Sequence, residues 1–167
     1  RPLDTLVLAS SSPRRHALLE SLGIAFQSDP PSVDENIDST DPEAMVAVLA
    51  LDKARAVSPR HPNLPVVAAD TTVVLDGVSL GKPSSPAEAV EMIRRLRGRE
   101  HAVVTGVALV DPHSGRTLTH LCRTAVHMRD YSDAEIDAYV ASGDAEDKAG
   151  AYAVQHQGFH PASHVEG

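Results

Sequence analysis

The sequence predicts an α/β fold, a single domain with a mixed, twisted β-sheet flanked by helices. Short apolar runs typical of buried strands alternate along the chain with helix-length segments that begin at a cap residue followed by proline. The hydrophobic content of 42% is that of a globular protein, and 167 residues suit one domain with a core of its own. We therefore expect one domain over residues 1–167.

The chain opens with a predicted strand, a polar turn and a helix. Residues 6–9 form a continuous apolar run, as expected for a strand covered on both faces. Ser12 is a good N-cap, Pro13 suits the first helical position, and Gly23 ends the helix. The apolar side of this helix is expected from Leu18, Leu19 and Leu22.

Local signals place the remaining elements. A loop is expected over residues 28–41, a helix over 42–57, a strand over 66–75 with a tight turn at 76–77, a return strand to residue 80, and a helix over 86–96. A long antiparallel hairpin is expected from strands 101–110 and 117–128. Ser132 and Glu135 form a capping box for a helix ending near Gly143, residues 152–154 suggest a last short strand, and the tail is expected to be irregular.

Charge and cysteine content exclude several classes of protein. A net charge of −8 opposes a sequence-independent grip on nucleic acid, which needs a basic face. The single cysteine, Cys122, excludes an internal disulfide framework and a cysteine-based zinc site, and a reducing cytoplasm fits it. The longest apolar runs are far too short to span a bilayer. An anionic ligand would have to meet a local cluster of cations.

Two arginines stand where helix electrostatics disfavours them. Arg14 and Arg15 occupy the first turn of the first helix, whose N-terminus carries partial positive charge. Each is unfavourable there by a few tenths to about 1 kcal/mol, which makes sense if an anion binds. A phosphate could receive backbone N–H groups, hydroxyls of Ser10 or Ser12, and guanidinium contacts together. Two solvated surface arginines are the alternative.

Asp70 ends an apolar strand and precedes two threonines. Sites in open α/β sheets lie at the carboxyl ends of strands, where a carboxylate can deprotonate water or hold a divalent metal. The alternative is an aspartate that caps a turn.

Three further charged residues could complete a triphosphate site. Lys53 and Lys82 would join the arginine pair to give four cations, and charge stabilisation is most of phosphoryl-transfer catalysis. Glu35, in an acidic loop, could help to hold Mg²⁺, whose ligands are hard oxygens. Taken singly, each of the three is better explained as an ordinary surface residue. His156, His160 and His164 recur every four residues, but Gly158 and Pro161 argue against the helix that a shared metal site would need.

Several segments, taken in order, resemble the motifs of the Maf nucleotide pyrophosphatases. The similarity covers nearly the whole chain, and the ordered set is far more specific than any one segment. The segments are ASSSPRR at 9–15, ADTTVV at 69–74, LGKP at 80–83, HAVVTGV at 101–107, SDAEI at 132–136 and DKAGAYAVQ at 147–155.

The resemblance implies a Maf/ITPase-like α/β enzyme that cleaves a nucleoside triphosphate to the monophosphate and pyrophosphate. It implies a divalent metal, Mg²⁺ or Mn²⁺, held by Glu35 and Asp70, and often a homodimer. Asp70 matches the family's proton acceptor. The cleft positions match Ser10, Arg15, Glu35, Lys53 and Lys82. The positions that mark the branch acting on dTTP and UTP match Arg14, Thr71 and Gln155.

Two departures from the family pattern stand out. Residues 156–161, HQGFHP, replace a turn that is usually richer in glycine. The sequence also stops at Gly167, before a segment expected to carry a strand and a closing helix.

Two other functions stay open at this point. One is a house-cleaning pyrophosphatase for modified nucleotides, such as methylated pyrimidines or 7-methyl-GTP. The other is a nucleotide-binding regulator of cell division without catalysis, which the retained Asp70 disfavours.

Overall fold

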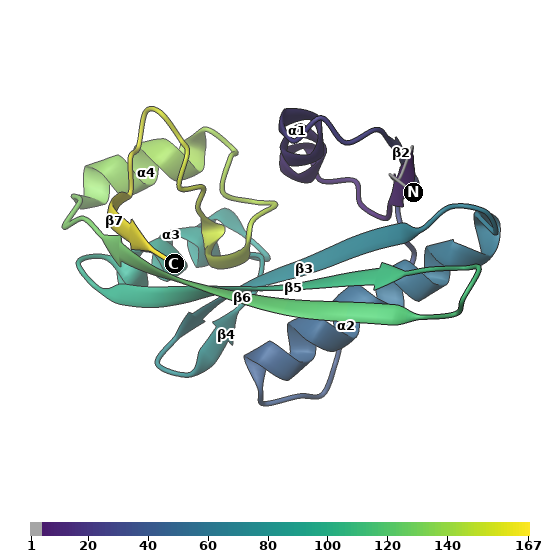
Figure 1. Cartoon of the computed structure of the whole chain (residues 1–167). Coiled ribbons are helices and arrows are strands. Elements are labelled where there is room, and N and C mark those ends of the chain that lie inside the picture. Colours follow the sequence, from purple (N-terminus) through teal and green to yellow (C-terminus); the bar gives the residue numbers. More distant parts are fainter. Residues whose placement is uncertain (1–4) are drawn as a thin grey trace. The chain divides into compact units, whose positions relative to one another are not determined.

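The computed structural model describes residues 5–167 and confirms the predicted α/β class (Figure 1). Within these residues it contains seven strands, four α-helices and two short 3₁₀ turns. The strands are β1 (Leu6–Leu8), β2 (Phe26–Ser28), β3 (Val66–Leu75), β4 (Val78–Leu80), β5 (Glu100–Val110), β6 (Thr117–Met128) and β7 (Ala162–Glu166). The helices are α1 (Pro13–Ser21), α2 (Pro42–Val57), α3 (Pro86–Leu96) and α4 (Asp133–Ala141), and the 3₁₀ turns are η1 (Ser58–Arg60) and η2 (Ala149–Ala151).

The strands form one mixed sheet in the order β2-β1-β3-β5-β6-β7, with β4 paired to β3. β1 runs parallel to both β2 and β3, whereas β4 is antiparallel to β3 and β7 is antiparallel to β6. The register pairs Leu8 of β1 with Val67 of β3, and Ala9 N–H donates to the Val67 carbonyl at 2.8 Å. The turn after β1 therefore begins beside the segment of β3 that leads to Asp70.

The chain divides into two compact units. Unit 1 comprises residues 1–70 and 105–121, and unit 2 comprises residues 71–104 and 122–167. The core of unit 1 is built where small side chains of α2 pack on β1, β3 and β5. Its buried members are Val7, Ala9, Ala50, Ala54, Val57, Val66, Ala68, Ala108 and Val110.

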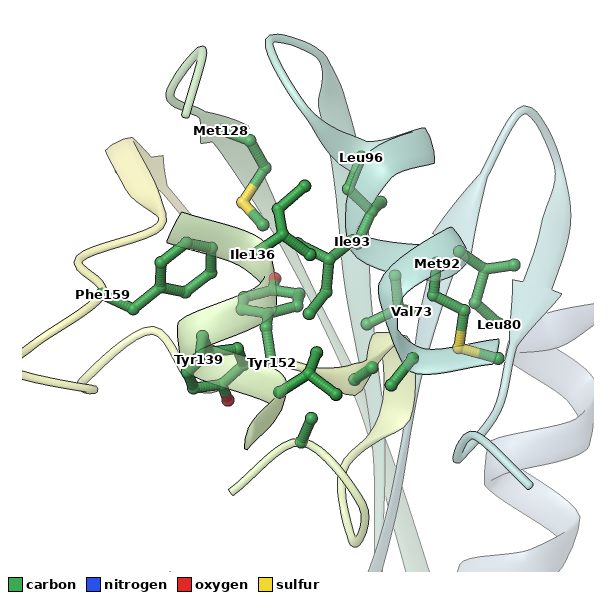
Figure 2. Packing of buried hydrophobic residues seen from close by; sticks show 14 of the residues in the cluster. Val73, Leu80, Met92, Ile93, Leu96, Met128, Ile136, Tyr139, Tyr152 and Phe159 are labelled. Carbon is green, nitrogen blue, oxygen red and sulfur yellow. The ribbon is translucent and has the colours of Figure 1, made fainter. Parts of the chain in front are cut away.

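The core of unit 2 is larger and holds most of the aromatic rings (Figure 2). Figure 2 shows side chains of α3 and α4 converging, with Ile93 beside Ile136 and Tyr139 beside Phe159. The two helices contact one another directly. This core fixes the segments that lead into η2 and out of it.

Most element boundaries follow the local signals in the sequence. α2 begins behind Asp41, whose side chain accepts hydrogen bonds from the N–H groups of Glu43 and Ala44. α3 is capped by Ser85, and α4 carries the predicted capping box of Ser132 and Glu135. No helix among residues 5–167 has the length and apolar character needed to cross a membrane.

Three predictions about individual elements are wrong. α1 has no buried residue: Leu18 and Leu22 are 62% and 69% exposed and Leu19 is only partly buried, so the three leucines do not form a buried apolar side. Residues 152–154 form no strand, because the chain turns at Val154 and Gln155. The tail is not irregular throughout, because residues 162–166 pair with β6 to form β7, and β2 lies at 26–28 without a predicted counterpart.

Candidate active site

The turn that follows β1 is fixed by its own polar groups. Ser10 is 4% exposed, and its Oγ accepts a hydrogen bond from Ser12 N–H at 3.1 Å. Nε2 of His16 lies 3.0 Å from the Ser10 carbonyl oxygen, and the Ser28 hydroxyl donates to that oxygen at 3.1 Å. His16 was missed by the sequence analysis; its place one turn into α1, above a serine turn, is the signal that could have found it.

The N-terminus of α1 differs from those of the other three helices. Ser12 is its N-cap, as predicted, but within the described part of the chain its side chain makes no capping hydrogen bond. The first turn of α1 contains no acidic residue, whereas α2, α3 and α4 each carry at least one. Neither a capping side chain of Ser12 nor a first-turn carboxylate offsets the partial positive charge of this terminus, which favours an anion.

The two arginines lie in different environments, because Arg15 is partly buried and Arg14 is exposed. Nη1 of Arg15 donates to the Ala69 carbonyl at 2.8 Å and so ties α1 to the residue before Asp70. Burial lowers the pKa of Arg15, and the negative charges of Asp70 and Glu35 oppose that shift. Arg14 is exposed on the same helical turn.

Lys53 connects the two predicted carboxylates. Its Nζ lies 2.7 Å from Oδ1 of Asp70 and 2.7 Å from Oε1 of Glu35. The Lys53 and Asp70 side chains are 9% and 14% exposed, while that of Glu35 is 53% exposed. Lys53 belongs to the buried face of α2, so the apolar packing of this helix carries its ammonium group to the end of the apolar part of β3. The sequence analysis predicted Lys53 only as a further cation for a triphosphate, and its position within an otherwise apolar face of α2 is the signal that it did not use.

The site in unit 1 thus joins six predicted residues through hydrogen bonds, ion pairs or charge interactions. Ser10 and Ser12 shape the turn, Arg15 reaches the chain beside Asp70, and Lys53 links Asp70 to Glu35. The arrangement offers cations and N–H groups to phosphate oxygens and a carboxylate to a water molecule.

The carboxylates offer the kind of donor that Mg²⁺ and Mn²⁺ prefer. Asp70 and Glu35 both supply hard oxygen atoms and are brought together through Lys53. Within residues 5–167, no group of three or more His, Cys, Asp or Glu side chains is arranged to hold a metal ion. Two protein carboxylates nevertheless suit Mg²⁺, which commonly takes its other ligands from substrate phosphates and water.

Three predicted residues belong to unit 2. Thr71 follows Asp70 in β3 and is partly buried, while Lys82 and Gln155 are exposed. The segments of Lys82 and Gln155 are connected through η2, because Gly150 N–H donates to the Gly81 carbonyl at 3.1 Å. Gly150 has φ +68°, and an added Cβ would lie 2.8 Å from a methyl group of Val73, so this close approach requires glycine.

A family profile described as "Maf-like protein" matches residues 5–167. The chain belongs to the Maf family. Curated relatives include proteins named dTTP/UTP pyrophosphatase from Moorella thermoacetica, 47% identical over 99% of this chain and 86% of the relative, and from Dictyoglomus turgidum, 43% identical over 97% and 85%. A third, from Thermomicrobium roseum, is 47% identical over 98% of this chain and 75% of the relative.

Solved structures support the fold independently. The chain resembles a nucleoside-triphosphatase, dITP/XTP pyrophosphatase, from Mycobacterium abscessus, with a TM-score of 0.51 and 21% identity over 76% of this chain and 75% of that one. It also resembles the Staphylococcus aureus Ham1 protein, with a TM-score of 0.54 and 14% identity over 75% and 72%. At these identities the likeness shows the fold alone, and it confirms the ITPase-like architecture expected of this Maf protein.

Proposed function

We propose that this Maf protein hydrolyses dTTP and UTP to the monophosphate and pyrophosphate. The observation that carries the proposal is the Lys53 bridge between Asp70 and Glu35, next to an arginine and an uncapped helix N-terminus. Relatives of 43–47% identity named dTTP/UTP pyrophosphatase support the choice of reaction.

In the proposed mechanism, unit 1 first binds phosphate. The N–H groups at the start of α1 and the hydroxyls of Ser10 and Ser12 donate to phosphate oxygens, and Arg14 and Arg15 neutralise their charge. This role explains why two arginines are tolerated at a terminus that disfavours cations. Lys82 is proposed as a further phosphate-binding cation, on the strength of the resemblance.

Asp70 is proposed as the general base. Its carboxylate takes a proton from water while the water oxygen forms a bond to the α-phosphorus. The bond from the α-phosphorus to the bridging oxygen breaks, and its electron pair leaves with pyrophosphate. Lys53 holds the Asp70 carboxylate in place, at the 2.7 Å distance given above.

A divalent cation, Mg²⁺ or Mn²⁺, is proposed to bind at Asp70 and Glu35 together with the triphosphate. When bound it would neutralise charge on the phosphates and on the leaving pyrophosphate. The chain itself contributes the carboxylate oxygens and the cations that surround them.

The preference for thymine and uracil bases is assigned to Arg14, Thr71 and Gln155. This assignment is carried by the resemblance, since all three match the branch that acts on dTTP and UTP. A homodimer, a cytoplasmic location and a single domain over residues 1–167, of which 1–4 lie outside the described residues, also stay predictions. Light scattering of the purified chain tests the homodimer.

A substrate panel tests the proposed reaction. The purified chain is incubated with Mg²⁺ and dTTP, UTP, CTP, dGTP or 7-methyl-GTP, and pyrophosphate, orthophosphate and monophosphate are measured separately. Pyrophosphate and monophosphate should appear in equal amounts, fastest from dTTP and UTP. Release of orthophosphate, or a folded chain that binds dTTP without turnover, would contradict the proposal, and faster hydrolysis of 7-methyl-GTP would contradict the substrate assignment.

A further inference from the structure

Gln155 lies in a tight turn whose two ends are held by one side chain. His156 N–H donates to the Ala153 carbonyl at 3.2 Å, which places Val154 and Gln155 at the two central positions of a β-turn. Both central residues are exposed. The direction in which Gln155 projects therefore depends on how the turn is anchored at Ala153 and His156.

Tyr139 of α4 contacts both anchors. Its hydroxyl accepts a hydrogen bond from Ala153 N–H at 3.1 Å, and its ring lies edge-on to the His156 imidazole, with 4.8 Å between centroids and 76° between planes. The same hydroxyl donates to Oδ2 of Asp144 at 2.9 Å. Because the carboxylate can only accept, the Tyr139 proton is directed to Asp144 and an oxygen lone pair faces Ala153.

Tyr139 is itself rigidly held. It is 3% exposed, and its ring stacks on Phe159 with 4.6 Å between centroids and 14° between planes. Figure 2 shows the two side chains next to one another. Asp144 is in turn bound by Nζ of Lys148 at 2.9 Å. Burial raises the pKa of Asp144, but hydrogen bonds from Lys148 and Tyr139 outweigh it, so that the pKa stays below its usual value and the acceptor stays ionised.

Residues 156–161, which stand where the family usually has a glycine-rich turn, also hold the C-terminal end of the Ala153–His156 turn. Nδ1 of His156 accepts from Phe159 N–H at 3.0 Å, and His160 N–H donates to the His156 carbonyl at 3.1 Å. Phe159 thus supports both the ring of Tyr139 and the imidazole that packs against it. In this chain, side-chain contacts fix a segment that more glycine would leave freer.

We propose that Tyr139 is a positioning residue for base recognition, acting through the Ala153–His156 turn to orient Gln155. The proposal rests on the proposed function, which assigns Gln155 to the base. It deepens that function because it places a determinant of substrate choice in α4, outside the motif that contains Gln155.

The test compares Tyr139→Phe, Gln155→Ala and the double variant in a double-mutant cycle. Tyr139→Phe keeps the stack on Phe159 and removes the hydroxyl. We expect it to lower the ratio of kcat/KM for dTTP over kcat/KM for dGTP about fivefold, the worth of one ordinary hydrogen bond, mainly through KM for dTTP. In the Gln155→Ala background, Tyr139→Phe should leave that ratio unchanged.

Tyr131→Phe is the matched control, because it also removes a buried hydroxyl from the same core, one that donates to the Ile93 carbonyl at 2.7 Å. It should cost similar stability and leave the ratio at its wild-type value. An unchanged ratio in Tyr139→Phe, or an equal change in both Gln155 backgrounds, overturns the inference and leaves the proposed reaction standing.

Hydrogen exchange separates failure of the inference from failure of the proposed function. Amide exchange over residues 153–157 should be faster in Tyr139→Phe than in wild type or Tyr131→Phe. If the wild-type chain hydrolyses no triphosphate, the proposed function fails, and the exchange data alone then decide whether Tyr139 holds the turn. Unchanged exchange in Tyr139→Phe overturns the positioning role in either case.

Discussion

The Nζ of Lys53 lies 2.7 Å from Oδ1 of Asp70, although the two residues are 17 positions apart in the chain. The same nitrogen lies 2.7 Å from Glu35. One ammonium group therefore balances two carboxylates, of which one is largely buried and the other half-exposed. This relationship links the packing of α2 to the chemistry proposed for β3.

Replacing Asp70 with asparagine should abolish most of the activity. Asp70→Asn keeps the size of the side chain but removes the base, so kcat for dTTP should fall about 100-fold or more. Pyrophosphate release under saturating dTTP and Mg²⁺ measures it. The matched control is Asp52→Asn, an exposed aspartate next to Lys53 on α2, which should keep wild-type turnover. Wild-type turnover in Asp70→Asn would remove Asp70 from the mechanism.

Removing the Lys53 charge should destabilise the fold through the carboxylate that it leaves behind. Lys53→Met keeps a long apolar side chain in the buried face of α2 but leaves Asp70 without this cation. The expected loss is about 1–2 kcal/mol of unfolding free energy, below the value for fully buried pairs because Glu35 is half-exposed.

The double variant Lys53→Met with Asp70→Asn separates the two contributions. Because neutral asparagine costs less to bury than an unpaired carboxylate, urea unfolding should show part of the lost stability regained. If the double variant is less stable than the sum of the single effects, the ion pair is not the cause.

The elements that the sequence predicts well are those whose signals are local. Asp41, Ser85 and Ser132 each cap a helix through N–H groups two or three residues away, so a short window contains the whole interaction. β7 could not be predicted in this way, because its residues are mostly exposed and its strand conformation comes from pairing with β6.

The candidate site likewise contains residues that local sequence signals reveal and residues that they do not. Asp70 and Arg15 stood out because charged residues in apolar or electrostatically unfavourable positions need a reason, whereas Lys53 was predicted only as a further cation for a triphosphate. His16 has a local signal, since its partner is the Ser10 carbonyl only six residues away, but Tyr139 did not stand out, because its partner is the Ala153 N–H of another segment. A side-chain contact with the backbone of another segment, such as that of Tyr139, leaves no residue-type pattern in the sequence.

Gly106 permits the close approach of α2 to β5. Replacing it with alanine should displace α2 from the sheet and lower the unfolding free energy. A Cβ at this position would lie 2.5 Å from the carbonyl oxygen of Val46, a backbone atom that moves only with α2. Gly106→Ala should therefore cost about 1–3 kcal/mol, the usual cost of overpacking. Denaturant unfolding measures it against Gly81→Ala, where an added Cβ meets no atom within 4 Å. Equal stability of the two variants would show that α2 adjusts freely.

The stability of the fold should fall in mild acid because of one buried histidine. His101 is 4% exposed, its Nε2 lies 2.5 Å from the Tyr152 hydroxyl, and within the described residues its Nδ1 has no hydrogen-bond partner. Burial, with a smaller contribution from the charge of His127, lowers the pKa of His101 from 6.5 to about 4. The unfolded chain therefore binds a proton below pH 6.5 that the folded chain binds only near pH 4.

Between these two pH values, acid favours the unfolded state, and this histidine should remove up to about 3 kcal/mol of unfolding free energy as pH falls from 6.5 to 4. Urea unfolding at intervals of half a pH unit measures the slope. The side chain introduced by His101→Gln does not titrate in this range. The slope of the unfolding free energy against pH should therefore fall by the contribution of about one bound proton. His113→Gln, at an exposed turn, should keep the wild-type slope. If His101→Gln keeps it as well, the acid sensitivity arises elsewhere in the fold.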